Sequence, residues 1–71
     1  MTKTVQQQID QLTRDIDLAR EAMQIEQDRY NREHFSWTSQ DVDDWREARR
    51  SDGDRLRELL EERDRLRGEL P

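Results

Sequence analysis

Cysteine is absent from the chain, so neither a disulfide nor a thiolate metal site can hold the fold together. Glycine occurs twice and proline once, which leaves few residues that would interrupt a long helix. Apolar runs are short, and none approaches the roughly 18 residues that a transmembrane helix needs. The first residues also lack the apolar segment of a signal peptide. We therefore expect a cytoplasmic protein that makes no contact with a membrane.

Apolar residues are scarce, at 30% of the 71 residues, whereas charged residues make up 44%. This composition is close to that of chains that do not fold. A chain of this length forms one domain at most, here residues 1–71, and it buries too little surface to be stable without additional support. In the absence of disulfides, that support has to come from well-packed helices or from association between copies.

Positive charge is not concentrated on any part of the chain. The formal net charge is −5, and acidic and basic residues alternate throughout. The most basic stretch, Arg46–Arg67, holds eight arginines but also seven carboxylates. Proteins that bind a nucleic-acid duplex usually carry a basic face. We therefore expect no direct contact with nucleic acid.

The first half of the chain has the apolar spacing of a coiled coil. Intervals of four and three residues alternate, as in the a and d positions of a heptad, and we call this row of positions the seam. Only Glu26 interrupts its apolar character. Thr4 is a suitable N-cap, and neither glycine nor proline occurs before Glu33. A helix is predicted over about 4–33. Its seam positions are Val5, Ile9, Leu12, Ile16, Ala19, Met23, Glu26 and Tyr30.

Residues 34–38 break this period and predict a turn. Thr38 has the character of an N-cap, and Asp41 stands three residues later, where its carboxylate can complete a capping box. A second helix is therefore predicted over about 39–69, with Gly68 and Pro71 as its stop. Its seam positions are Val42, Trp45, Arg49, Asp52, Leu56, Leu59, Arg63, Leu66 and Leu70.

Gly53 leaves open whether the second helix is continuous or breaks into two, because Asp52 could cap a third helix. Helix lengths favour continuity, since two helices of about 30 residues would each span roughly 45 Å and could pair along their whole length. The predicted fold is therefore all-α, a two-helix antiparallel coiled-coil hairpin. Two such hairpins could dimerise into a four-helix bundle.

Charged residues that interrupt one seam are predicted to meet opposite charges on the other. If the chain folds back about residue 36, Glu26 comes close to Arg49, and Arg20 comes opposite Asp52. Such pairs add little stability but can fix the register of two helices.

Catalytic patterns are missing from the sequence. It has one histidine, His34, and neither a glycine-rich phosphate loop nor a nucleophile elbow. Carboxylates on a thin hairpin point into water, where no cleft alters their pKa. We therefore expect no catalysis, no metal and no cofactor.

All four aromatic residues lie in or beside the predicted turn. One interpretation is a structural cluster that holds the turn, built from Tyr30, Trp37 and Trp45. The other is an exposed recognition site, because tryptophan and tyrosine are favoured as interface anchors. Phe35 and Trp37 are its candidate partner-binding residues, and Phe35 is the one that we expect to be left exposed.

Asp41, Asp43 and Asp44 stand in the first turns of the second helix, where carboxylates complement the helix dipole. They could also form an acidic, partner-binding tip. In outline, the acidic tip and the segments Glu33-His34 and Trp45–Arg49 resemble the N-terminal coiled-coil finger of Gre-type transcript-cleavage factors. That resemblance covers the finger alone and implies tip carboxylates that hold a metal in the polymerase secondary channel.

Leu18, Ala22 and Ile25 form a second apolar row on the first helix, outside the seam, which we call the apolar strip. Scattered surface apolar residues are ordinary in soluble proteins. The alternative is that the strip pairs two hairpins or docks on the helix of another protein. We expect association with a protein partner, with a homodimer favoured.

The sequence thus favours a non-catalytic protein–protein interaction module, such as a small bacterial or phage assembly or adaptor protein that acts through helical surfaces. An alternative is a regulator or inhibitor that inserts its aromatic and acidic tip into a larger protein machine. A metal-assisted enzyme is the third hypothesis.

Overall fold

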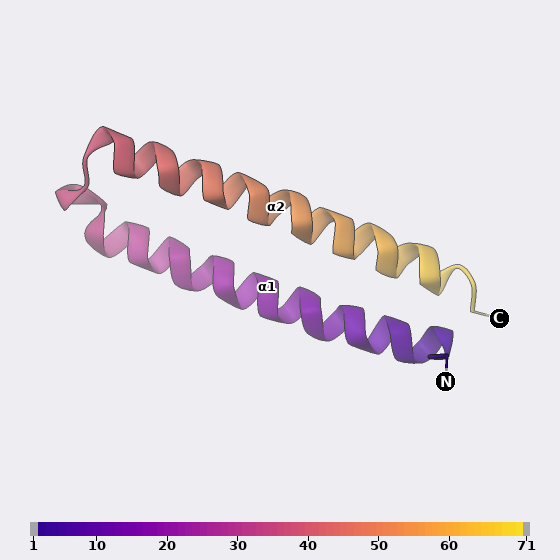
Figure 1. The fold of residues 1–71 in the computed structure, drawn as a ribbon. Helices are drawn as coiled ribbons and strands as arrows, with labels where there is room; N and C mark the ends of the chain where they lie inside the picture. Colours follow the sequence, from indigo (N-terminus) through magenta and orange to yellow (C-terminus); the bar gives the residue numbers. More distant parts are fainter. Residues whose placement is uncertain (1, 71) are drawn as a thin grey trace.

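Two long helices make up nearly the whole protein (Figure 1). The computed structural model describes residues 2–70. Helix α1 spans Val5–Glu33 and α2 spans Ser39–Arg67, and a short 3-10 turn, η1 (His34–Ser36), follows α1. The helices lie side by side and run in opposite directions, so that both termini are at one end. The predicted all-α hairpin is therefore confirmed.

Both helices begin with the same arrangement of hydrogen bonds. Thr4 Oγ1 accepts from the backbone N–H of Gln7 at 3.1 Å, and Gln7 Oε1 accepts in return from the Thr4 N–H at 3.0 Å. Thr38 and Asp41 form the matching pair, with both distances 3.1 Å. Each capping box satisfies donors that the first turn of a helix leaves without a backbone partner. Both N-caps lie at the predicted residues.

The turn is held by local hydrogen bonds. His34 Nδ1 donates to the carbonyl of Tyr30 over 2.7 Å, and Ser36 Oγ donates to the carbonyl of Glu33 over 2.9 Å. The N–H of Trp37 donates to the carbonyl of His34 at 3.1 Å, and Trp37 itself is extended. The Tyr30 carbonyl also accepts from the backbone N–H of His34, so both the backbone and the side chain of His34 close the end of α1. The reversal therefore needs neither glycine nor proline.

The hairpin core is a single row of side chains. The buried apolar residues among those described are Ile9, Ile16 and Leu66, and Ile16 is fully buried. All predicted seam positions of α1 are buried or half-buried, as are those within α2. Leu70 follows α2 and is 39% exposed. Helix α2 ends two residues earlier than predicted, with Gly68 as its C-cap; Pro71 lies outside the described residues.

One predicted ion pair forms and the other does not. Glu26 Oε2 lies 3.0 Å from Arg49 Nη1, as the fold-back scheme required. Asp52, however, contacts Arg49 Nη2 at 3.0 Å rather than Arg20. Arg49 stands three residues before Asp52 on the same helix, so its guanidinium reaches both carboxylates. Arg20 is exposed.

Helix α2 continues through Gly53 without a break. Gly53 has no left-handed backbone conformation, and a Cβ atom built there would have no neighbour within 4 Å. A close approach of the helices therefore does not require glycine at this position. None of the helices within residues 2–70 has the length and apolar character needed to span a membrane.

Gly53→Ala should stabilise the hairpin by about 0.5–1 kcal/mol, because alanine favours the helix and fits the open space. Urea unfolding followed by circular dichroism, at fixed protein concentration, measures the change. Gly68→Ala is the control. Its Cβ would lie 3.3 Å from the carbonyl oxygen of Arg65, so it should give no gain. Destabilisation by Gly53→Ala would contradict a continuous α2.

Candidate functional site

Tyr30 is the centre of an aromatic stack at the tip, which we define as the turn and the adjoining helix ends. Its ring lies 4.4 Å from the ring of His34 and 4.5 Å from that of Trp45, and both pairs are stacked. Trp37 contacts Tyr30 edge-on at 5.8 Å. Offset and edge-to-face pairs of this kind are favourable beyond the area they bury. Tyr30, Trp37 and Trp45 therefore pack on one another, which is the packing that the structural interpretation predicts.

Phe35 is outside this stack. Its side chain is 84% exposed, and its ring contacts only that of His34 among the described aromatic pairs, at 4.1 Å. Its exposure was expected from the sequence. Because Phe35 does not contribute to the packing of the helices, a partner could contact it without disturbing the fold.

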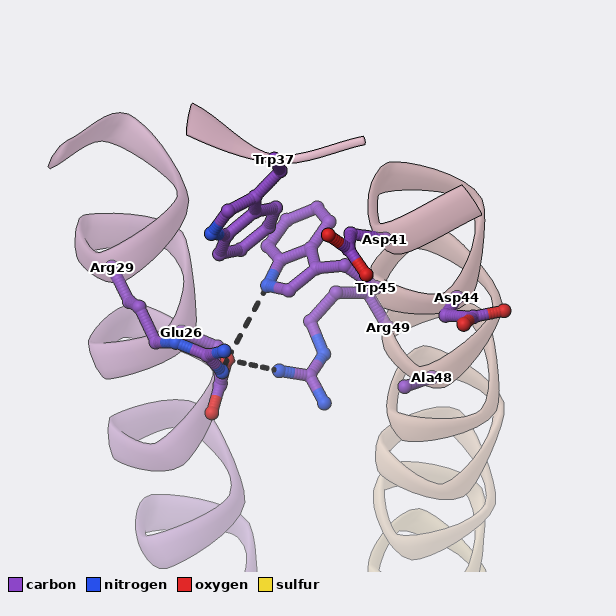
Figure 2. Close-up of a pocket in the computed structure, with 8 residues that line it drawn as sticks. All are labelled: Glu26, Arg29, Trp37, Asp41, Asp44, Trp45, Ala48 and Arg49. Carbon is purple, nitrogen blue, oxygen red and sulfur yellow. Dashed lines mark hydrogen bonds and ion pairs between the residues drawn. The ribbon is translucent and has the colours of Figure 1, made fainter. Parts of the chain in front are cut away.

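Glu26 connects the two helices below the tryptophans (Figure 2). Its Oε2 accepts hydrogen bonds from Trp45 Nε1 at 3.3 Å and from Arg29 Nη1 at 3.2 Å. The same oxygen is 3.0 Å from Arg49 Nη1. Two cations and an indole N–H thus surround one carboxylate, whose side chain is 29% exposed. This contact fixes Glu26 in a seam that is otherwise apolar on α1.

Arg49 is less completely satisfied than Glu26. Its Nη1 is within ion-pair distance of Glu26, but neither this nitrogen nor Nε has hydrogen-bond geometry to any acceptor within residues 2–70. The guanidinium carbon also lies 5.6 Å from the Trp45 ring. A half-buried ion pair with unused donors adds little net stability, but removing one partner leaves the other charge uncompensated.

These residues border an open groove of about 470 Å³ between the helices, which we call the tip groove. Figure 2 shows Trp37 and Trp45 at its upper end and Glu26 below them. Arg29 lies over the Trp37 ring, with its guanidinium carbon 5.1 Å from the ring centroid. The lining residues are Glu26, Arg29, Trp37, Asp41, Asp44, Trp45, Ala48 and Arg49.

The predicted tip residues are only partly brought together. Trp37, Asp41 and Asp44 line the tip groove, whereas Phe35 and Asp43 do not. Asp41 accepts from the Thr38 N–H, and Asp44 accepts from Gln40 Nε2 at 2.7 Å. Within residues 2–70, no three histidine, cysteine or acidic side chains are arranged to hold a metal ion.

The apolar strip is on the surface of α1. Leu18 is 63% and Ile25 is 58% exposed, and Ala22 is exposed as well. Arg29, which lines the tip groove, follows Ile25 by four residues and so belongs to the same helix face. The strip thus leads directly to the groove.

A second, smaller groove lies toward the termini, and we call it the distal groove. It measures about 210 Å³ and is lined by Lys3, Gln8, Gln11, Leu12, Glu62 and Leu66. Gln11 precedes Leu18 by seven residues, which places it on the face of the strip. A hydrogen bond from Arg65 lowers the pKa of the Glu62 carboxyl. Because Gln11 lines the distal groove and Arg29 lines the tip groove, both grooves and the strip share one face of the hairpin, which we call the strip face.

The sequence interpretation treated the strip and the tip as separate sites. The heptad positions carried a signal that they are connected, because the strip and Ala48 occupy c and g positions. In an antiparallel pair, the g positions of the two helices flank the same side of the seam.

Glu26→Ala should destabilise the hairpin by about 1–3 kcal/mol, because it removes the carboxylate that joins Arg49 and Trp45 to α1 and leaves the half-buried Arg49 with Asp52 of its own helix. Thermal and urea unfolding measure this loss. Glu21→Ala removes an exposed carboxylate from the same helix and should change stability by less than about 0.5 kcal/mol. Equal effects of the two substitutions would show that the Glu26–Arg49 contact does not hold the helices together.

Comparisons of the chain with protein-family models, with curated proteins and with solved structures gave no match. Function is therefore inferred from the surfaces of this chain: the apolar strip, the two grooves beside it and the exposed ring of Phe35.

Proposed function

We propose that this protein is a non-catalytic protein–protein interaction module, a small assembly or adaptor protein that acts through the strip face. The observation that carries the proposal is the exposure of Leu18 and Ile25, two large aliphatic side chains on one face of α1. They lie seven residues apart, with Ala22 between them. This is the spacing of anchors in helix-to-helix recognition.

The thin core supports this proposal. Only three apolar side chains are buried within residues 2–70, and each contributes about 1.5–3 kcal/mol. Small domains with so little buried surface commonly gain stability from association. Burying Leu18 and Ile25 against a partner would add two side chains of the same kind to the buried set.

The groups at the tip are engaged in structural contacts, which supports a role without catalysis. His34, the one histidine of the chain, is stacked on Tyr30 and bonded to a backbone carbonyl. Asp41 caps α2, and Glu26 contacts two arginines. None of these contacts pairs a nucleophile with a general base, which is the arrangement that covalent catalysis uses. The absence of catalysis and the cytoplasmic location stay predictions.

Leu18→Asp combined with Ile25→Asp should abolish binding to protein partners, because each buries a charge in the proposed interface. The immobilised natural chain and the variant are compared for the proteins that they retain from source lysate, including further copies of the chain. Gln24→Asp with Asn31→Asp is the matched control. It introduces the same residue at the same seven-residue spacing, at exposed positions of α1 outside the strip.

A milder pair, Leu18→Ala with Ile25→Ala, keeps the helix propensity of α1 and should weaken binding by at least tenfold. Circular dichroism checks that the helices persist in every variant. If the aspartate and alanine variants retained the same proteins as the natural chain, the strip would have no role in binding.

A second candidate function, regulation by insertion of the tip into a larger protein, is favoured by the 84% exposure of Phe35. For this function, Phe35→Ala with Asp43→Asn should remove a bound protein that the strip variants still retain. Neither residue holds the fold in the described contacts. If both sets of variants lost the same protein, the tip would have no separate partner.

A further inference from the structure

The tip half of the strip face carries opposite charges on its two helices. Arg29 and Arg32 follow Ile25 on α1, at intervals of four and seven residues. Across the tip groove, α2 presents Asp41 and Asp44. Arg29 uses Nη1 and Nε for Glu26 and Glu33, and an arginine has five N–H donors. Donors therefore remain for an additional acceptor.

In the middle of the same face, α1 presents apolar side chains and α2 presents short ones. The Glu26–Arg49 contact places the level of Ile25 on α1 close to that of Ala48 on α2. Ala48 and Ser51 are both exposed, and they share this face because they are separated by three residues. Ile25 projects from α1 at this level, whereas α2 offers short side chains. Leu18 lies about two turns further from the tip, at the level of Arg55 and Glu58.

We propose that the partner of the strip face is a second copy of this chain, packed face to face with both tips at the same end. A two-fold axis parallel to the helices then places α1 of each copy on α2 of the other. Ile25 packs on Ala48 and Ser51 of the other copy, and Arg29 and Arg32 meet Asp44 and Asp41. This inference rests on the proposed function, since it names the partner of the strip.

Charge at the tips favours this arrangement over the reversed one. With tips at opposite ends, α1 would lie on α1 and α2 on α2. Asp44 of each copy would then lie against Glu58 and Glu62 of the other, so that like charges would meet along α2, whereas Arg29 would come near Asp15. With tips together, each copy gains two opposite-charge contacts. Against these stand the like-charge contacts of Asp15 with Glu58 and Glu62 of the other copy. Complementary charges across an interface set its orientation.

The strip face is large enough for a stable dimer. The hairpin measures 52 × 21 × 16 Å, so its broad face exceeds the roughly 800 Å² that each partner buries in a standard interface. The contact also pairs each helix with a helix of the other copy. The product is a four-helix bundle, in which the seams of both hairpins and the strips form one core.

The distance between the two tips tests the arrangement. The chain has no cysteine, so Phe35→Cys gives a single attachment site for a spin label at a position that does not support the fold. Pulsed electron paramagnetic resonance should give a label separation of about 20 Å when the tips are together. Tips at opposite ends would be about 40 Å apart, from the helical rise on either side of the strip.

Cross-linking tests the contact itself. A mixture of Ile25→Cys and Ala48→Cys chains should form a disulfide-linked or bismaleimide-linked dimer. Glu47→Cys replaces Ala48→Cys in the control, because the side chain of Glu47 is 72% exposed and lies about 100° around the helix from Ala48. Equal linking of Cys at positions 47 and 48 to position 25 would overturn the proposed face.

The remaining outcomes separate this inference from the proposed function. A solution mass of one chain, with no dipolar coupling between labels, would overturn self-pairing. If the strip then still retained another protein in the capture experiment, the proposed function would stand. A dimer with a separation of about 40 Å, or one that survived Leu18→Asp with Ile25→Asp, would overturn the arrangement. If the natural chain formed no dimer and captured no protein through the strip, the self-pairing and the proposed function would both be overturned.

Discussion

The contact between Glu26 and Arg49 fixes how the two helices align. Each residue interrupts an otherwise apolar stretch, and each is half-buried where the helices meet. A shift of α2 by one heptad would place Glu26 against Val42 or Leu56, and a carboxylate facing an apolar side chain is unfavourable. The pair thus selects one alignment and, with it, the level at which the tryptophans, the tip groove and the apolar strip stand relative to each other.

Much of the fold follows from individual residues. Thr4 and Thr38 predict both helix starts because a capping box depends only on residues three apart. The seam from Val5 to Tyr30 predicts which face of α1 is buried. The equal lengths of the two predicted helices argued against a break at Gly53, and α2 is indeed continuous. Local chemistry and periodicity suffice for these features, since each depends on residues that are close in the sequence.

Features that depend on side chains from both helices were predicted less well. Asp52 was assigned to Arg20, but the flexible guanidinium of Arg49 lies closer and contacts it instead. The tip groove was not foreseen, because its walls arise from the angle at which Trp37 and Trp45 pack around Tyr30. Among the five predicted tip residues, exposure of Phe35 was anticipated. The separation of Asp43 from Asp41 and Asp44 was overlooked, although residues three apart share a helix face and Asp43 stands outside that spacing.

The short connection at the tip has a consequence for how the hairpin folds. Only residues 34–38 separate the helices, so closing this loop costs less entropy than bringing together any pair of residues nearer the termini. Tyr30 and Trp45, which stack directly beside it, are the first distant side chains that can meet at low cost. Pairing of the helices then extends residue by residue toward Ile9 and Leu66. Folding is accordingly expected to be fast, because most contacts in the chain are local.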